Sequence, residues 1–510
     1  MGLTRPRYRC SVELRLVSGL LITGTSSDAG KSLVVTGLCR VLARRGVSVA
    51  PYKAQNMSNH SMVCRDGSEI GRAQYLQAQA AGVEATSAMN PVLLKPGSDR
   101  RAHVVVRGRP AGELRAGEYA TGRGHLADAA FAAYEELAAA HDVIVCEGAG
   151  SPAEVNLRAG DYVNLGLAQR FSLPTVLVGD IDRGGVLAAL YGTWALVADE
   201  DRPLLRAYLI NKFRGDASVL EPGLDEVTRR TGMPSLGVLP WLTDVWLDSE
   251  DSLSMGAWGE AEDDVPADRR LSVAVVRLPR TSNGTDVDAL AAEPGVDVRV
   301  TVDTDHVREA DLVVLPGSRA TVSDLAWLRR SGLAEVVVDR ARRGAPVLGI
   351  CGGYQMLLDE VVDDVESGDD DEGSESPSPP TVPGLGLLPG RVVFHHDKVL
   401  ARPSGSWRGV PVEGYEIHHG VVEPTGGEDF PGGHAVGPVR GSIWHGTLEG
   451  DGFRRALLAD VARASGAAWS AEAGGTPFAS RRERMIDTLA DALETHVDID
   501  ALLALTKDSR

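Results

Sequence analysis

The sequence predicts an α/β fold made of two parallel-sheet domains. Short apolar runs rich in β-branched residues alternate with amphipathic helical stretches, a pattern typical of parallel sheets covered by helices on both faces. The chain has 510 residues, of which 43% are hydrophobic, enough for two or more separate cores. A polar stretch at residues 259–270 divides the strand-forming runs into two blocks, and we place the domain boundary there.

The N-terminal block, residues 16–262, contains five candidate strands. Each is a short apolar run followed by a polar or glycine-rich turn, as expected where parallel strands lead into ligand-binding loops. In chain order they span residues 16–23, 47–52, 142–147, 174–180 and 205–211. Residues 1–15 are expected to form a loose extension.

The C-terminal block, residues 271–510, begins with three further candidate strands. They span residues 271–278, 311–315 and 345–350. Residues 363–383, DDVESGDDDEGSESPSPPTVP, are too charged and too rich in Ser and Pro to pack against a core. We therefore predict a disordered surface insertion within this second domain.

Composition argues against several classes of protein. With 71 acidic and 52 basic residues the formal net charge is −19, which disfavours nucleic acid and anionic membranes as partners. No run approaches the roughly 18–20 apolar residues that span a bilayer. The five cysteines are scattered and include no Cys-x-x-Cys pair, which argues against a disulfide framework or a zinc site. We expect a cytoplasmic protein and make no prediction of its oligomeric state.

A phosphate-binding loop is predicted directly after the first strand. The run GTSSDAGKS at residues 24–32 lies between an apolar strand and a helical stretch. In such loops glycines let backbone N–H groups turn toward phosphate oxygens, the lysine neutralises the terminal phosphates, and the hydroxyl can coordinate Mg²⁺. The loop is one residue longer than the usual pattern, and a glycine-rich turn with a solvent-exposed lysine is the alternative. The predicted nucleotide ligands are Gly24, Thr25, Gly30, Lys31 and Ser32.

Two further strand ends complete the predicted nucleotide site. Glu147 ends the strand 142–147, and we predict that it holds Mg²⁺ together with Ser32, because open α/β sheets bind ligands at the carboxyl ends of their strands. A helix-capping role for Glu147 is the alternative. Asn211 ends the strand 205–211 and could reach a purine edge, although a turn asparagine is equally compatible.

A second chemical site is predicted at Cys351. The run GICGGYQ at residues 349–355 follows an apolar strand and leads into a helix, so the cysteine lies on a tight turn. Such a turn exposes a nucleophile above the sheet, and the helix N-terminus favours the thiolate. The N–H group of Gly352 is a candidate for an oxyanion hole, so thioester chemistry is indicated. A buried structural cysteine is the alternative.

The predicted base for this nucleophile is His445, in the glycine-flanked run GSIWHG at residues 441–446. Spatial proximity cannot be read from sequence, so four other histidines remain candidates: His395, His396, His418 and His419. Gly317, in a Pro-Gly-Ser turn after strand 311–315, could supply a second oxyanion N–H group, although a plain turn fits as well.

Eight motifs together resemble the cobyric acid synthase family, the glutamine-dependent amidotransferases of cobalamin biosynthesis. The resemblance extends from about residue 16 to the C-terminus, and the motifs occur in the family's order: KAQNMS, GSEIGRAQ, MNPVLLKPGSD, EGAGSPAEVNL, DIDRGG, NKFRGD, GICGGYQML and GYEIHHG. The N-terminal half is similar to dethiobiotin synthetase, whose phosphate loop has the same extra residue. The C-terminal half is similar to triad-type glutamine amidotransferases.

The resemblance implies an activity, its substrates and two catalytic residues. An ATP-binding amide ligase domain and a glutamine amidotransferase domain would amidate the b, d, e and g carboxylates of adenosylcobyrinic acid a,c-diamide, using ATP, Mg²⁺ and glutamine. Cys351 would be the nucleophile and His445 the base. Triad enzymes often carry Glu two residues after the histidine, but this chain has Thr447, so no third member is visible. The run NMSNHS at residues 56–61 also departs from the expected NMSLNS.

A basic cluster between residues 95 and 115 is the predicted site for the corrinoid carboxylates. Six basic side chains occur there, and those we single out are Lys95, Arg100 and Arg101. A solvated loop without a specific role is the alternative.

Three rival functions remain. The sister enzyme cobyrinic acid a,c-diamide synthase is disfavoured by KAQNMS and NKFRGD. A partition-type P-loop ATPase is disfavoured because residues 25–29 contain no additional lysine. A nucleotide-binding scaffold with a silent glutaminase half is disfavoured by the presence of both Cys351 and His445.

Overall fold

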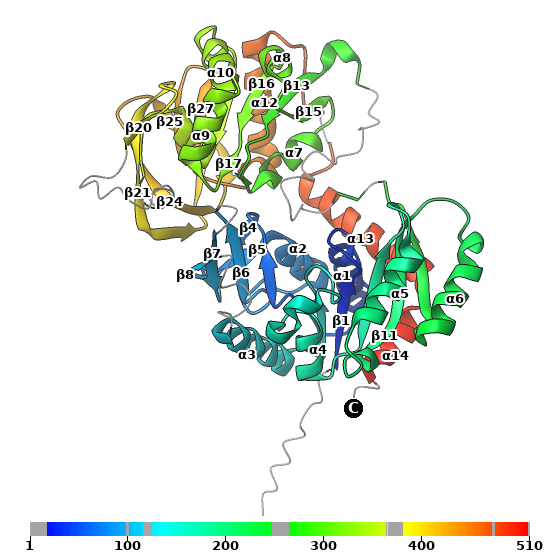
Figure 1. Cartoon of the computed structure of the whole chain (residues 1–510). Helices are drawn as coiled ribbons and strands as arrows, with labels where there is room; N and C mark the ends of the chain where they lie inside the picture. Colours follow the sequence, from blue (N-terminus) through cyan, green and yellow to red (C-terminus); the bar gives the residue numbers. More distant parts are fainter. Residues whose placement is uncertain are drawn as a thin grey trace, which may run out of the picture.

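Two α/β domains, each built around a parallel sheet, make up the computed structural model of the chain (Figure 1). The predicted extension 1–15, most of the predicted insertion 363–383 and Arg100 lie outside the described residues. Within the described part of the chain no helix has the length and apolarity needed to cross a membrane. The structure describes residues 18–97, 101–115, 124–243, 245–246, 265–363, 365, 381–471 and 475–507.

The first domain contains a six-stranded parallel sheet in the order β12-β11-β10-β1-β9-β2. The five predicted strands are present, with ends shifted by no more than two residues, because their apolar runs are buried on both faces. The strands are β1 (Ser18–Gly24), β2 (Val49–Tyr52), β9 (Val143–Glu147), β10 (Thr175–Asp180), β11 (Leu205–Phe213) and β12 (Ser235–Pro240). The helices are α1 (Lys31–Arg44), α2 (Arg72–Ala81), α3 (Gly124–Ala140), α4 (Leu165–Phe171), α5 (Val186–Leu196) and α6 (Glu221–Thr231).

Small sheets that the sequence did not predict are formed by strands between residues 55 and 115 of the first domain. Their strands are mostly short, so periodicity gives little signal. Of the three residues singled out in the predicted basic cluster, Lys95 lies on β6 and Arg101 on β7 of a four-stranded sheet. The strands are β3 (Gln55–Met57), β6 (Val92–Pro96), β7 (Arg101–Val106) and β8 (Arg109–Arg115), and a separate hairpin is formed by β4 (Ser61–Val63) and β5 (Glu69–Gly71).

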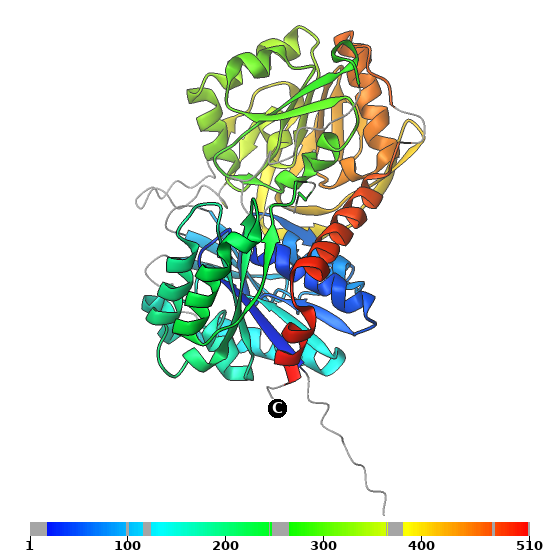
Figure 2. The same cartoon turned by 90° about the vertical axis from the view of Figure 1, so that its right-hand side faces the viewer.

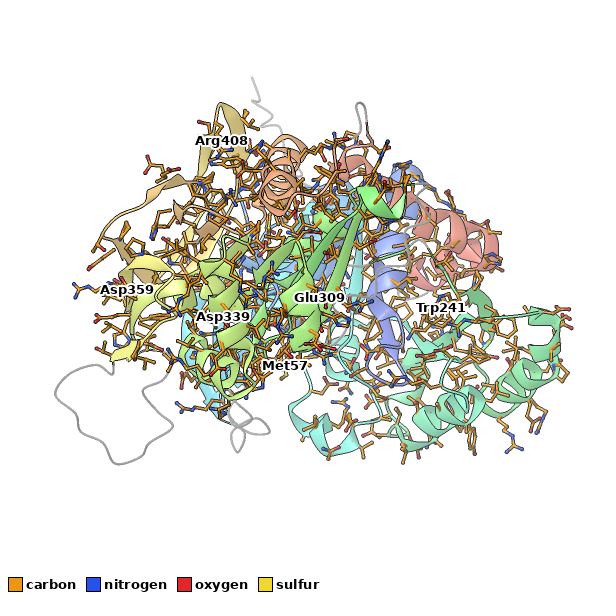
Figure 3. All side chains as sticks on the ribbon, turned by 90° about the horizontal axis from the view of Figure 1, so that it is seen from above. Met57, Trp241, Glu309, Asp339, Asp359 and Arg408 are labelled. Atoms are coloured by element: carbon orange, nitrogen blue, oxygen red, sulfur yellow. The ribbon has the colours of Figure 1, made fainter. Side chains whose placement is uncertain are left out.

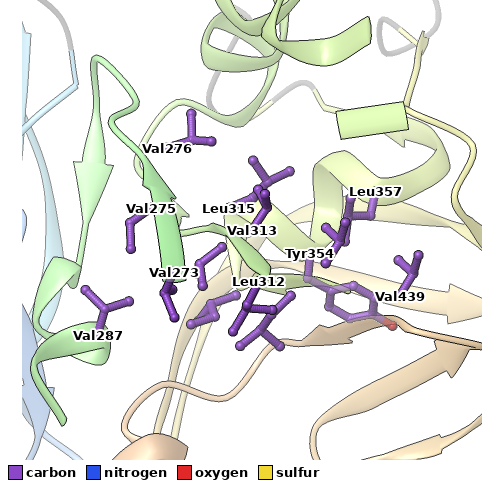
Figure 4. Packing of buried hydrophobic residues seen from close by; sticks show 14 of the residues in the cluster. Val273, Val275, Val276, Val287, Leu312, Val313, Leu315, Tyr354, Leu357 and Val439 are labelled. Carbon is purple, nitrogen blue, oxygen red and sulfur yellow. The ribbon is translucent and has the colours of Figure 1, made fainter. Parts of the chain in front are cut away.

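The second domain contains a seven-stranded sheet in the order β15-β13-β16-β18-β27-β26-β25. Five strands are parallel, and β26 and β25 extend the sheet in antiparallel fashion. Figure 4 shows Val273 and Val313 from this sheet in one buried cluster with Tyr354 and Leu357 of α11 (Gly352–Leu357). The strands are β13 (Leu271–Val276), β15 (Val296–Thr301), β16 (Leu312–Leu315), β18 (Val347–Ile350), β25 (Glu428–Phe430), β26 (Gly433–Val436) and β27 (Val439–Ser442).

Helices and a smaller sheet flank this second core. The last three residues of the predicted insertion form β20, which pairs with β19, so the packed chain resumes before residue 383. The helices are α7 (Asp288–Ala291), α8 (Thr304–Glu309), α9 (Thr321–Arg330), α10 (Leu333–Arg342), α11 (Gly352–Leu357) and α12 (Asp451–Ser465). The remaining strands are β14 (Thr281–Ser282), β17 (Gly317–Ser318), β19 (Leu358–Val362), β20 (Thr381–Pro383), β21 (Leu388–Ala401), β22 (Ser404–Trp407), β23 (Val410–Glu413) and β24 (Glu416–Pro424).

The chain returns to the first domain at its C-terminal end. Helices α13 (Phe478–His496) and α14 (Ile499–Lys507), red in Figures 1 and 2, lie along the first domain. Leu493 of α13 packs so closely on Gly37 of α1 that a Cβ at Gly37 would lie 2.4 Å from a Leu493 methyl carbon. The predicted second domain runs to residue 510, but these helices share a buried core with α1. An amphipathic pattern shows that a helix has an apolar face and does not show which sheet covers it.

Candidate active sites

The phosphate loop connects β1 to α1 in a conformation that requires glycine. Gly30 has a φ of 100°, and a Cβ there would lie 1.9 Å from the Asn211 side-chain nitrogen. The Lys31 ammonium donates hydrogen bonds to the carbonyls of Ser26, at 3.0 Å, and Gly150, at 3.3 Å. It therefore lies across the loop, where a nucleotide's terminal phosphates would bind.

The predicted metal pair is brought together at the start of α1. The Ser32 hydroxyl donates to Glu147 Oε1 at 2.8 Å, Lys53 Nζ donates to the same oxygen at 2.8 Å, and Gln77 Nε2 donates to Oε2 at 2.5 Å. Burial would raise the pKa of Glu147, but Lys53 and these hydrogen bonds hold it below its usual range. An ionised carboxylate beside a hydroxyl is an oxygen donor set that suits Mg²⁺. The sequence analysis had assigned no role to Lys53 or Gln77.

A cavity of about 420 Å³ opens beside this loop. Its walls come from the phosphate loop, from residues 53–57 and from residues 149–164, so it includes Lys31 and Lys53. Met57, labelled in Figure 3, also lines it and is 49% exposed. A volume of this size is typical of small-molecule sites.

Asn211 holds the phosphate loop through a hydrogen bond to the loop backbone. Its side-chain nitrogen donates to the Ala29 carbonyl at 3.0 Å, and Asn211 is buried. The neighbouring Lys212 donates to the Asp28 carbonyl at 2.7 Å and pairs with Asp180 at the same distance. The predicted contact of Asn211 with a purine stays a prediction, and in this structure its amide nitrogen holds the loop.

Cys351 lies on a sharp turn between β18 and α11. Its φ of 48° and ψ of −109° are unusual for a residue with a side chain and match the strained strand-to-helix turn expected of a nucleophile, but Cys351 is buried rather than exposed as predicted. A Cβ on Gly352 would lie 2.6 Å from the Ser318 nitrogen, so the glycine lets the 317–318 segment approach. The two predicted oxyanion glycines, Gly317 and Gly352, therefore lie on adjoining segments beside Cys351.

His445 reaches Cys351 because their strands are neighbours. β18 pairs with β27, with Ile350 opposite Ser442, so the residues that follow each strand emerge together. The buried His445 ring interacts with the Cys351 sulfur. Two of the competing histidines, His418 and His419, line the cavity next to Cys351.

Asp286 supplies the acidic partner that the sequence analysis did not find. Its Oδ2 lies 2.7 Å from His445 Nδ1, and its Oδ1 accepts the Gly446 N–H at 2.7 Å. It belongs to the short 3-10 helix η7 (Gly284–Val287), in chain order well before the nucleophile. Position 447 does not provide this acid, because in this fold the acid comes from another element. The sequence feature that could have indicated Asp286 is its position shortly after the predicted strand 271–278.

The electrostatics favour the charged form of His445. Burial by itself would lower the pKa of His445, but the Asp286 carboxylate and Cys351 together raise it to about 10. The imidazolium therefore persists at neutral pH, where it can give a proton to a leaving amine. A cysteine, a charged histidine and an orienting carboxylate form an arrangement suited to acyl transfer through a thioester.

The cavity beside Cys351 lies where the two domains meet. It holds about 30 Å³ and is lined by Asn59 and Lys95 of the first domain together with Lys398 of the second. Lys95 and Lys398 each donate at 2.5 Å to the fully buried Glu69. Burial lowers the pKa of Lys398 to about 8, although Glu69 acts in the opposite direction.

Two of the predicted corrinoid-binding residues, Lys95 and Arg101, have acidic partners in the structure. Lys95 is buried, and its charge is already paired with Glu69 at the domain interface. Arg101 lies 3.7 Å from Glu113 on the neighbouring strand. Binding of the corrinoid by this cluster stays a prediction, and Arg101 is better placed for it than Lys95.

Each half of the chain matches the model of a known domain family. Residues 20–254 match the model of a CobQ/CobB/MinD/ParA nucleotide binding domain, and residues 272–451 match that of a CobB/CobQ-like glutamine amidotransferase domain. The chain is 62% identical over 492 residues to the cobyric acid synthase of Cutibacterium acnes, covering 96% of this chain and 100% of that protein. It is 54% identical over 495 residues to the cobyric acid synthase of Mycolicibacterium vanbaalenii, covering 96% and 97%.

Proposed function

The chain belongs to the cobyric acid synthase family, which makes it an amidating ligase of cobalamin biosynthesis, and we propose that it converts adenosylcobyrinic acid a,c-diamide to adenosylcobyric acid. In this reaction the b, d, e and g carboxylates become amides, and each amide consumes one ATP and one glutamine. The observation that carries the proposal is the pairing of Cys351, His445 and Asp286 in one domain with a phosphate loop in the other.

In the glutaminase half, Cys351 attacks the side-chain amide carbon of glutamine. The backbone N–H groups of Gly352 and Gly317 would stabilise the oxyanion, and His445 gives its proton to the departing ammonia. A γ-glutamyl thioester remains on Cys351. Water then cleaves it to release glutamate and restore the thiolate.

In the ligase half, a substrate carboxylate oxygen attacks the γ-phosphorus of ATP and ADP leaves. The resulting acyl phosphate gives ammonia an activated carbon to attack, and phosphate leaves as the amide forms. Lys31 lies where it can neutralise charge on the transferring phosphate. Ser32 and Glu147 would hold Mg²⁺, which supplies further charge neutralisation when bound.

Ammonia must pass from one centre to the other before it is protonated. The cavity next to Cys351 is lined by residues of both domains, and this supports a protected path through the interface. We expect glutamate dehydrogenase with its cosubstrates, which consumes free ammonia, to leave glutamine-driven amidation unchanged. Strong suppression by this scavenger would contradict a protected path.

Counting amide groups by mass spectrometry tests the reaction directly. The protein is incubated with the corrinoid diamide, Mg-ATP and glutamine, and four amidations are expected. Cys351→Ser should abolish the glutamine-driven product and retain the ammonia-driven product. Amidation of cobyrinic acid at two positions, with none on the diamide, would instead identify the sister diamide synthase.

A further inference from the structure

One short segment of the first domain contacts both turns that carry the glutaminase side chains of the second domain. This segment, residues 59–72, comprises the β4–β5 hairpin and the first residue of α2, and we name it the docking hairpin. We propose that the docking hairpin positions Asp286 and His445, so that the glutaminase centre is complete only while the first domain is docked. The inference rests on the roles proposed above for Cys351 and His445.

The first contact fixes the turn that carries Asp286. The Ser61 N–H donates to Asn283 Oδ1 at 2.8 Å, and the Gly284 N–H donates to His60 Nδ1 at 3.2 Å. His60, Ser61 and Asn283 are all buried, so these hydrogen bonds are shielded from water. Asn283 and Gly284 begin the turn in which Asp286 follows two residues later. The hydrogen bonds therefore fix where the Asp286 carboxylate meets His445.

The second contact fixes the turn that follows His445. Arg72 Nη2 lies 2.5 Å from an oxygen of Glu449, and Arg482 of α13 donates to the other oxygen at 2.9 Å. Burial alone would raise the pKa of Glu449, but Arg72 and Arg482 hold it below its usual range. Glu449 ends the short helix η8 (Thr447–Glu449), which begins two residues after His445.

The two contacts belong to one unit of the first domain. The Arg72 N–H donates to the His60 carbonyl at 3.1 Å, which joins the two ends of the docking hairpin. Asn59, at the start of the segment, lines the cavity beside Cys351. Arg72 also begins α2, and Gln77 of the same helix donates to Glu147 at the nucleotide site. One rigid element thus reaches both catalytic centres.

Positioning of this kind matters because catalytic hydrogen bonds tolerate little displacement. A misplacement of about 1 Å can cost about 10²-fold in rate. The 2.7 Å contact between Asp286 and His445 joins two turns, and each turn is held from the first domain. Loosening either turn should weaken the support that Asp286 gives to the imidazolium.

Full-length Asn283→Gly tests the proposal. Asn283 has a φ of 49°, which glycine adopts readily, so the change removes the side-chain acceptor and leaves the turn unstrained. We expect glutaminase kcat to fall about 10- to 100-fold, with the KM for glutamine changed by less than about threefold. The alkaline limb of the glutaminase pH profile should move to lower pH. Amidation driven by added ammonia should stay within about twofold of wild type.

A second variant and a matched control separate positioning from general loosening of the interface. Glu449→Gln removes the charge that Arg72 holds and should shift the same limb in the same direction. Arg402→Met is the control, because Arg402 donates to the Val63 carbonyl of the docking hairpin at 3.1 Å and is not among the described residues that line the Cys351 cavity. It should leave the pH profile unchanged.

The outcomes distinguish this inference from the function on which it rests. Wild-type kinetics in Asn283→Gly and Glu449→Gln, or an equal shift in Arg402→Met, would overturn the positioning role while leaving the glutaminase assignment intact. A wild-type protein without Cys351-dependent glutaminase activity would overturn both.

Discussion

The two catalytic centres are built in different ways. The nucleotide site takes its phosphate loop from one continuous run, and the acid that joins Ser32 comes from the neighbouring strand of the same sheet. The proposed glutaminase centre collects Asp286, Cys351 and His445 from three separate turns, two of which are held by the first domain. The nucleotide site therefore depends on local folding, whereas the proposed glutaminase site depends on how the two domains pack.

The largest expected effect falls on the locally built centre. Lys31→Ala should reduce both glutamine-driven and ammonia-driven amidation by at least about 10³-fold, because the Lys31 ammonium lies across the loop, where it can neutralise the transferring phosphate. Glutamine hydrolysis, measured as glutamate release, should continue. This selective loss would confirm that the two centres can be separated.

Lys212→Met is the matched control for that change. Lys212 also donates to a carbonyl of the phosphate loop, that of Asp28, but its charge is paired with Asp180 at the end of β10, and Lys212 is not among the described residues that line the nucleotide cavity. We expect its loss to cost less than about tenfold in amidation rate. Ammonia-driven amidation that survives in Lys31→Ala would contradict the assigned role of the loop.

A somewhat smaller effect is expected at the centre built across domains. Asp286→Asn should lower glutaminase kcat by about 10²- to 10³-fold, because an amide cannot stabilise the imidazolium as a carboxylate does. Ammonia-driven amidation should be retained. The measurement is glutaminase activity and ammonia-driven amidation across a pH series.

The sign of the pH effect follows from the raised pKa of His445. The imidazolium is present below a pKa of about 10 and is lost as pH rises through that value. Removing the Asp286 charge removes one cause of the elevation, so the pKa of His445 falls and the alkaline limb moves to lower pH. An unchanged alkaline limb in Asp286→Asn would show that Asp286 does not support the imidazolium.

The same contrast explains what the sequence could reveal. Strands β1, β9 and β18, the phosphate loop and Cys351 were predictable because each is a short run with a strong local pattern. Asp286 was not, because its partnership with His445 depends on where the short helix η7 lies after folding. Lys95 was predicted to bind a substrate carboxylate, and only the fold shows it buried and paired with Glu69, which also pairs with Lys398 of the second domain.

We expect the stability of the first domain to depend on the C-terminal helices α13 and α14, which are distant from it in the chain. Leu493→Ala should lower the free energy of unfolding by about 2–4 kcal/mol, because the side chain is fully buried against Gly37 of α1. Both catalytic activities should change little in the folded protein. Hydrogen exchange by mass spectrometry should show faster exchange of the α1 amides.

Leu457→Ala on α12 is the matched control, since it removes an equally buried leucine from the core of the second domain. It should leave exchange in α1 unchanged and speed exchange around α12 instead. If Leu493→Ala left α1 protected, the C-terminal helices would contribute no stability to the first domain despite their contact. Faster exchange confined to α1 and its neighbours would show instead that the C-terminal helices stabilise the nucleotide-binding domain. Even the more locally built centre would then depend on residues that follow the glutaminase domain in the chain.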